Sequence, residues 1–512
     1  MLGRRAEPPR TTGQTGRGGW STHVRRIAAN LDRIFRHKCG KTIKSSNLEL
    51  GPWGYHPCMD WVTCGYSAAC TGVASRPSGF CLAHLDNDQL GTALGGLAAG
   101  RLLDLRGTTV SSDLLSRVLD ATDRRPGRTR LDRARFTGDV RLSGVTFAGD
   151  VSLDGARFDR LASFFGARFE GNVSLAGVRF ARELSFHGVT VRGHASLDRA
   201  VMSRDALFSQ TVFGHGLSCE RARFDGYATF DDARLGDGAA FRGARFGRTL
   251  SFRKVSGPAG FEAAHFAADA YLSATGRLSA ARARADGLLD VTVARCGVDL
   301  RHVEVAGAMT VRLTDAQADL EGAVLRGPAT VTGRGRSVLT SLRQVEAGDL
   351  GLFGLDLSMC RFAGLTHPAG VRVKDCTFAL TPRGVRVSLR WPMLRWFSRR
   401  RALADERTLG GHADPDDPGA SPDRLAALYA GLRPSDSATS ADFAFAAMEM
   451  RRQAGHGWWL SVSWLLCGYG MRMGRAAAWF VLVTAITTAA VAWSSASHAG
   501  DRPDTVRPAL NR

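Results

Sequence analysis

The chain has 512 residues, which is long enough for several structural modules, and it carries a formal charge of +20. The balance of 68 Lys and Arg against 48 Asp and Glu excludes an acidic protein, and most of the cations are Arg. Two explanations of the Arg excess stay open: the base composition of the gene, or attraction to anionic lipid or nucleic acid.

Residues 1–50 are predicted to be a disordered, basic N-terminus, because Pro, Gly, Thr and Arg predominate and apolar periodicity is missing before Ile27. The segment contains no hydrophobic run that could serve as a signal peptide. We therefore expect the N-terminal body to be cytoplasmic. In that compartment the ten cysteines are expected to be reduced rather than paired as disulfides.

Residues 51–127 are predicted to form a small Cys/His-containing capping module with a helix. Its candidate metal ligands are Cys64, Cys70, Cys81 and His84, with Cys58 as an alternative. A Cys₃His set can close a tetrahedral structural zinc site. The Cys-x-x-His end has suitable spacing, whereas the five residues between the first two cysteines exceed the usual two to four. The alternative is a module with ordinary buried cysteines and a surface histidine.

A fixed period of eleven residues runs without a gap from Phe136 to Ser256. Each copy has a large apolar anchor at its first and seventh positions, as in Phe136 and Leu142. Anchors that lie six and then five residues apart would point to different faces of an α-helix, so the repeat is not helical. The pattern that remains is small–x–large followed by a turn, and it predicts a stacked solenoid.

The triplets Ala156-Arg157-Phe158 and Val173-Ser174-Leu175 carry this pattern. It resembles the pentapeptide-repeat family, in particular membrane-anchored members of actinobacterial type. The resemblance implies an all-β solenoid, a right-handed quadrilateral β-helix with the anchors stacked inside, here over residues 128–383. One extra residue per pair of pentapeptides predicts about eleven coils of about 22 residues each rather than about 20. Beyond Ser256 the rhythm is looser but persists.

The remaining segments are predicted to connect the solenoid to a membrane. Residues 384–423 are expected to be a basic cap and a flexible linker rich in Asp, Pro and Gly. Residues 424–470 are expected to be a helical juxtamembrane region, whose apolar end, 458–470, is too short to cross a bilayer alone and is expected to be an interfacial helix or a re-entrant turn.

A single C-terminal transmembrane helix is predicted over residues 474–495. Ala476 to Trp493 contains no charge, and Trp479 and Trp493 lie near its ends, where interfacial aromatic residues belong. The positive-inside rule places the N-terminal body in the cytoplasm and the polar tail, 496–512, outside. The sequence therefore predicts a single-pass protein of the cell membrane.

Two classes of function are disfavoured. Some pentapeptide-repeat proteins imitate DNA and bind type II topoisomerases through an acidic rod, but this repeat is net positive and the chain carries a predicted membrane anchor. No P-loop, zinc-protease or nucleophile-elbow motif is found, and His187, His194 and His215 recur at no ligand spacing. Catalytic and cofactor-binding residues are therefore not predicted, and a nucleic-acid partner is not expected.

The class that remains is a membrane-anchored scaffold or interaction protein without catalytic activity. Outward side chains of the repeat could dock a protein partner, which the sequence does not identify, an anionic surface or the inner leaflet, or could simply be solvated; examples are Arg141, Arg157, Arg168 and Arg179. The alternatives are a DNA-mimicking, topoisomerase-binding protein and a zinc-containing regulatory protein.

Overall fold

The computed structural model describes residues 60–381, 384–387, 394–397, 399–408, 421–455, 458–470 and 473–499. The predicted disordered N-terminus, Cys58 and the tail beyond residue 499 lie outside the described residues. The chain forms a β-solenoid of about 11 turns of parallel stacked strands, which confirms the predicted fold class. It divides into two compact units, residues 1–284 and 285–512.

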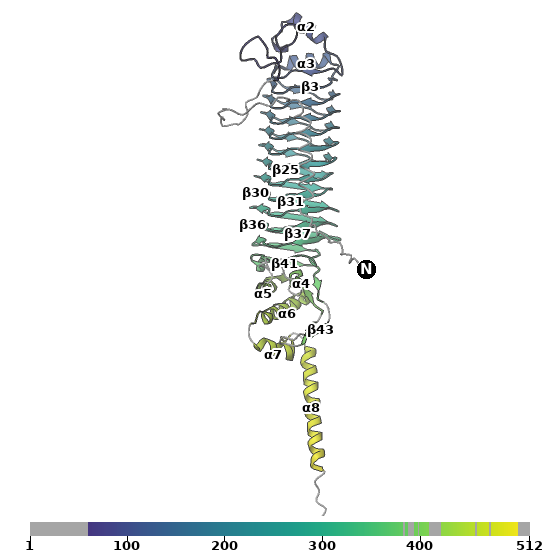
Figure 1. Cartoon of the computed structure of the whole chain (residues 1–512), viewed down its shortest axis with the longest axis vertical. Coiled ribbons are helices and arrows are strands. Elements are labelled where there is room, and N and C mark those ends of the chain that lie inside the picture. The colour runs from purple at the N-terminus through teal and green to yellow at the C-terminus, as the bar shows by residue number, and fades with distance from the viewer. Residues whose placement is uncertain are drawn as a thin grey trace, which may run out of the picture. The chain divides into compact units, whose positions relative to one another are not determined.

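In the first unit, short parallel strands stack in four sheets that each gain one strand per turn (Figure 1). The β1 sheet contains β1 (Leu103–Asp104), β3 (Thr129–Arg130), β7 (Val151–Ser152), β11 (Val173–Ser174), β15 (Ala195–Ser196), β19 (Gly216–Ser218), β23 (Gly238–Ala240), β26 (Ala259–Gly260) and β29 (Leu278–Ser279). The β2 sheet contains β2 (Thr109–Val110), β4 (Arg135–Phe136), β8 (Arg157–Phe158), β12 (Arg179–Phe180), β16 (Val201–Met202), β20 (Arg223–Phe224), β24 (Arg245–Phe246) and β27 (His265–Phe266). The strand β30 (Arg284–Ala285) begins at the last residue of the unit.

The other two sheets complete the four sides of the turns up to β22. The β5 sheet contains β5 (Val140–Arg141), β9 (Ala162–Ser163), β13 (Leu184–Ser185), β17 (Ala206–Leu207), β21 (Ala228–Thr229), β25 (Leu250–Val255) and β28 (Ala270–Ala274). The β6 sheet contains β6 (Thr146–Phe147), β10 (Arg168–Phe169), β14 (Thr190–Val191), β18 (Val212–Phe213) and β22 (Arg234–Leu235).

The second unit continues the same kind of parallel stacking and then changes to helices. Its parallel strands are β31 (Leu289–Ala294), β34 (Met309–Thr314), β37 (Ala329–Arg334), β40 (Leu350–Phe353), β41 (Val371–Lys374) and β46 (Arg433–Pro434) in one sheet, β32 (Gly297–Asp299), β35 (Gln317–Asp319) and β38 (Val338–Ser341) in a second, and β33 (Glu304–Val305), β36 (Val324–Leu325) and β39 (Glu346–Ala347) in a third. Two antiparallel pairs follow, β42 (Ala379–Leu380) with β45 (Arg401–Ala402) and β43 (Gly384–Val387) with β44 (Leu394–Phe397).

The predicted anchors form the core. All twenty-two anchors of the eleven copies are buried, from Phe136 and Leu142 to Phe246 and Phe252. Equivalent anchors of successive turns stack, with ring centroids 4.5 Å apart between Phe136 and Phe158. The interior is therefore a set of aromatic and aliphatic columns at the spacing of adjacent β-strands, which is what an in-register parallel solenoid requires.

The length of the turn changes along the chain. Val151 pairs with Val173, so a full turn takes two eleven-residue copies, as predicted. From β23 onward the turn is shorter, as the pairings of Ala239 with Ala259 and of Phe246 with Phe266 show. The β6 sheet ends at β22, and longer strands, beginning with β25, replace two short strands and the corner between them. Turns such as β31–β32–β33 consequently have three strands rather than the predicted four.

The recurring glycines have a conformational cause. One residue in every eleven adopts a positive φ at a corner, as at Gly144, Gly155 and Gly166. Further along, the same positions are held by residues such as Arg199 and Gln210, both with φ of 57°. Gly adopts this conformation without steric penalty, so its recurrence marks corners of the solenoid.

A polar ladder lines one corner beside the β1 sheet. Ser152 Oγ donates to Asp132, and Ser174 Oγ donates to Asp154 in the next turn. The backbone N–H of Ala176 also donates to Asp154 Oδ1, at 3.0 Å. Burial, opposed by these hydrogen bonds, raises the pKa of the Asp154 carboxyl from 3.8 to about 6.

Helices lie at the N-terminal end of the first unit. These are η1 (Leu82–His84), α2 (Asn87–Gly95) and α3 (Ser112–Ala121). The helix α3 begins after Ser111, whose side chain accepts a hydrogen bond from the backbone N–H of Leu114. It buries Leu114, Leu115, Val118 and Leu119, so it covers part of the solenoid end that would otherwise expose open strand edges (Figure 1).

The second unit ends in helices that pack against one another. They are η2 (Pro368–Gly370), α4 (Ala404–Thr408), α5 (Pro422–Gly431), α6 (Ser437–Gln453), α7 (Trp458–Cys467) and α8 (Met473–Ala499). The predicted linker contains α4, whose Asp405 carboxylate accepts hydrogen bonds from the backbone N–H groups of Phe362 and Ala363 at 2.8 and 3.1 Å. This carboxylate ties the helical region to a late turn of the solenoid.

Candidate functional site

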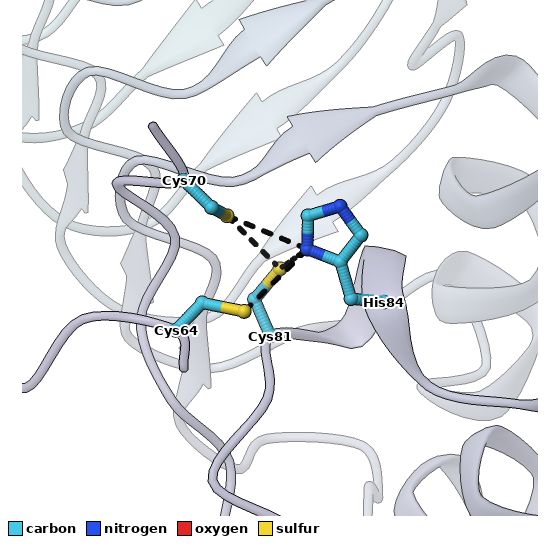
Figure 2. Close-up of side chains that lie close together, drawn as sticks. All are labelled: Cys64, Cys70, Cys81 and His84. Atoms are coloured by element: carbon cyan, nitrogen blue, oxygen red, sulfur yellow. Dashed lines mark hydrogen bonds between the residues drawn. The ribbon is translucent and has the colours of Figure 1, made fainter. Parts of the chain in front are cut away.

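The four predicted ligands converge in the N-terminal module (Figure 2). The chain brings them together through the antiparallel bridge between Thr63 and Val73 and through η1. The four ligand atoms all lie within 4.8 Å of one another, and they belong to Cys64, Cys70, Cys81 and His84. His84 Nδ1 lies 3.4 Å from each of the three sulfur atoms.

These distances match a tetrahedral zinc ion. With Zn–S near 2.3 Å and Zn–N near 2.0–2.1 Å, a regular tetrahedron separates S from N by about 3.5 Å and S from S by about 3.8 Å. The observed separation between the Cys70 and Cys81 sulfurs is 3.8 Å. Tyr66 stacks on the His84 ring with centroids 4.0 Å apart, which restricts the imidazole orientation. The donor set therefore fits zinc in number, type and spacing.

The thiols differ in their acidity without a metal. Burial raises the pKa of Cys64, but backbone N–H donors from Cys81 and Tyr66, together with the His84 side chain, outweigh it and lower the pKa to about 6. Burial raises the pKa of Cys81 to about 12, and the neighbouring Cys70 adds to this effect. A bound cation would favour the thiolate form at each sulfur.

The Cys₃His cluster is attached to the first turn of the solenoid. The backbone N–H of Val73 donates to the carbonyl of Arg106 at 2.8 Å, and Thr71 Oγ1 donates to the carbonyl of Gly107 at 2.9 Å. A Cβ on Gly72 would lie 2.7 Å from the Cys81 Cβ, so only Gly permits this close approach. The cluster therefore fixes the chain that covers the edge of the first turn.

Arg106 strengthens this attachment. Its guanidinium contacts Asp104 at 2.7 Å and Asp60 at 3.2 Å, and it lies 4.9 Å from the ring centroid of Trp61. These contacts connect the segment before the Cys₃His cluster to the β1 strand.

A second feature is a column of arginines on the outer face of the β2 sheet. It consists of Arg135, Arg157, Arg179, Arg223 and Arg245, all exposed and held in register by the parallel strands, with Val201 between Arg179 and Arg223. We call it the Arg column. Neighbouring strands lie about 4.8 Å apart, so these like charges are forced close together.

The structure separates the four arginines that the sequence groups together as outward side chains. Arg157 and Arg179 lie in the β2 sheet, whereas Arg141 lies in the β5 sheet and Arg168 in the β6 sheet. The reason is that one side of the solenoid recurs only at every second eleven-residue copy, as the pairing of Arg157 with Arg179 shows, so consecutive copies face different sides. Comparing every second copy of the repeat would have revealed the Arg column.

Three histidines also occupy defined corners. His194 and His215 lie on successive turns with ring centroids 5.1 Å apart, and His215 Nδ1 lies 3.3 Å from Asp237 Oδ2. Burial and the neighbouring His215 lower the pKa of His194. His187 stacks on Phe165, with centroids 5.5 Å apart. The sequence shows these histidines as scattered residues, so the His194–His215 pair was not predicted.

Among the described residues, α8 is the one helix long and apolar enough to cross a membrane, over Ala476–Ser494, and this stretch is not buried in the structure.

These features define a parallel β-solenoid with a Cys/His cap and a C-terminal apolar helix. A family model described as pentapeptide repeats (9 copies) matches residues 142–190 and 186–234. Residues 142–234 therefore carry pentapeptide repeats, as the small–x–large pattern predicted. Comparisons with curated proteins and with solved structures gave no match.

Proposed function

We propose that this protein is a non-catalytic scaffold, anchored in the cell membrane by one helix, that docks an acidic protein partner on the Arg column. The Arg column is the observation that carries the proposal. The partner would lie along the solenoid axis, because the cations are arranged in that direction.

The energetics of the column favour a functional explanation. Two unit charges about 5 Å apart repel by about 1 kcal/mol even in water. Arg135 and Arg223 are compensated by Asp159 and Asp225, at 2.8 and 2.6 Å. Within the described part of the chain, the other three members have no carboxylate partner; these are Arg157, Arg179 and Arg245. Carboxylates of a partner would relieve the repulsion and offer bidentate geometry to each guanidinium.

The same column argues against the alternative of DNA mimicry. A mimic must present carboxylates where DNA has phosphates, and a face of in-register arginines presents the opposite charge. It would attract nucleic acid rather than replace it.

Membrane attachment is supported by the exposure and length of the Ala476–Ser494 stretch. Arg451, Arg472 and Arg475 lie close to its N-terminal side, whereas the first arginine beyond it is Arg502. The positive-inside rule then favours a cytoplasmic N-terminal body and a single-pass topology.

The docking test uses a labelling enzyme fused to the N-terminus of the full chain in its own cells. The variant Arg157→Glu/Arg179→Glu/Arg245→Glu should lose labelled acidic proteins by about tenfold or more. The matched control, Arg141→Glu/Arg168→Glu/Arg234→Glu, changes the net charge equally on the β5 and β6 sheets and should retain them. An unchanged labelled set in the first variant contradicts the docking face. Equal losses in both would indicate non-specific charge attraction. Failure of the chain to sediment with membranes would contradict the proposed membrane anchor.

We further propose that the Cys₃His cluster holds one structural zinc ion through Cys64, Cys70, Cys81 and His84. Zinc would supply folding energy to a short segment with few buried side chains of its own. All four positions are occupied by protein donors, which is typical of structural rather than catalytic zinc. The metal would stabilise the cover of the first solenoid turn.

A further inference from the structure

The helix α7 has two different apolar faces. One is held by the protein: Trp464 is buried, and the Arg452 guanidinium of α6 lies 4.9 Å from its ring centroid. Arg452 is ion-paired with Glu449, which also accepts a hydrogen bond from Tyr469 Oη at 3.1 Å. The buried ion pair therefore fixes the rotation of α7 about its own axis.

The other face of α7 is exposed. Trp458 and Trp459 are 73% and 67% exposed, and Leu465 and Leu466 are 51% and 48% exposed. At about 100° per residue these four side chains fall within an arc of about 120°, and Trp464 lies on the opposite side. A continuous Trp and Leu face in water is unfavourable by about 25 cal/mol for each Å². Such a face marks a contact with an apolar phase.

The position of α8 identifies that phase. Trp479 Nε1 donates to the carbonyl of Leu465 at 2.9 Å, which places the end of α7 beside the first turn of the Ala476–Ser494 stretch. Residues at the start of a membrane span lie at the level of the lipid headgroups, where Trp is favoured. With ten residues, α7 is about 15 Å long and cannot cross a hydrocarbon core of about 30 Å.

We infer that α7 is an interfacial membrane helix, whose Trp458/Trp459/Leu465/Leu466 face lies at the boundary between headgroups and acyl chains of a phospholipid bilayer. The inference rests on the proposed membrane anchor. It adds a second lipid contact, and it makes the Glu449–Arg452 pair the link between the bilayer surface and the helical end of the solenoid chain. The burial depth expected of such a helix is about 5–10 Å.

The test is tryptophan quenching of the full chain, reconstituted in phosphatidylcholine–phosphatidylglycerol vesicles. The acyl chains are brominated either near the headgroup or near the methyl end. Trp458→Phe/Trp459→Phe keeps the face apolar, and it should reduce the fluorescence quenched by shallow bromines by about half, since the interfacial Trp479 and Trp493 remain. Trp61→Phe, in the N-terminal module, should leave the amount of fluorescence that is quenched unchanged. As a second variant, Leu466→Asp with Trp458 and Trp459 retained should shift the fluorescence of these two residues toward the solvent-exposed value.

Each outcome has a distinct meaning. If the chain floats with the vesicles but shallow quenching is the same in the Trp458→Phe/Trp459→Phe variant, the interfacial helix is wrong and the anchor stands. If quenching of this pair is stronger by deep than by shallow bromines, α7 is a re-entrant segment and the inference is overturned. If the chain does not float with the vesicles, the proposed membrane anchor itself fails.

Discussion

The adjacent residues Phe164 and Phe165 provide a direct test of how the solenoid is held together. Phe164 is fully buried, and its ring lies 4.6 Å from that of Phe186 in the next turn and 6.3 Å from that of Phe158. Phe165 is 54% exposed and contacts His187 at the surface. The two side chains are chemically identical and differ only in the side of the chain on which they point.

Phe164→Ala should lower the free energy of unfolding by about 3–5 kcal/mol, because it removes a buried ring and leaves a cavity that the stacked turns cannot close. That loss is a large part of the about 5–15 kcal/mol that stabilises a typical protein. Phe165→Ala should change the free energy by no more than about 0.5–1 kcal/mol.

The measurement is guanidinium unfolding of the full chain in detergent, followed by circular dichroism and by amide hydrogen exchange. Repeat proteins are stabilised by each turn and its interfaces, so exchange should accelerate first at the turns that contact Phe164, around residues 142–186. Equal unfolding midpoints for the two variants would refute the stacked core. Exchange that accelerates uniformly along the chain would refute its turn-by-turn character.

The metal cluster, the polar ladder and the helical region each give one further prediction. Cys81→Ser should reduce bound zinc from about one equivalent to well below half, as measured by elemental analysis after gel filtration. The control variant Cys376→Ser should keep its zinc. Zinc far below one equivalent in the unaltered chain would reject the metal site. Because burial raises the folded-state pKa of Asp154 from 3.8 to about 6, the stability that this group contributes is present below about pH 4 and is lost as the pH rises through 6. As the pH rises from about 4 to 6, the free energy of unfolding of Asp154→Asn should therefore increase by up to about 3 kcal/mol relative to that of the unaltered chain. A difference between the two chains that stays constant with pH would contradict this. Asp405→Ala leaves two buried N–H groups without an acceptor, so it should cost about 2–4 kcal/mol and accelerate exchange of those amides, while Asp405→Asn should cost less.

The eleven-residue period could be predicted because the anchors are buried on every turn, and the same residues that define the pattern, such as Phe158 and Leu175, also form the core. The shortening of the turn from β23 onward was not predicted. The shortening comes from the loss of one corner of the turn. The residues on either side of that corner still resemble degenerate repeats, so the loss is hard to see in the sequence. The sequence signal for the shorter turn was the reduced number of residues between the equivalent anchors Phe246 and Phe266.

The candidate site was likewise predicted only in part. The four Cys and His residues were grouped by proximity in the sequence, and they lie close together in the structure because the segment is compact. How the segment is attached was not predicted, because Gly72, Thr71 and Arg106 act through contacts close to β1, whereas the sequence pattern placed the start of the solenoid at residue 128. The Arg column was missed because the arginines were compared along the chain instead of across turns.

From β3 to β22 the strands of the first unit keep a constant register, which makes the length of this part adjustable in discrete steps. Strands of successive turns pair at equal offsets, as Val151 with Val173 and Val173 with Ala195. Deleting or duplicating two consecutive copies of the repeat would therefore return the chain to the same corner with every anchor in its own column. Each such event would shorten or lengthen this part of the solenoid by about 4.8 Å, whereas a single copy would move every following residue to the opposite side. Duplication of such a pair of copies in the gene would therefore lengthen the solenoid while each outward residue keeps its side of the turn.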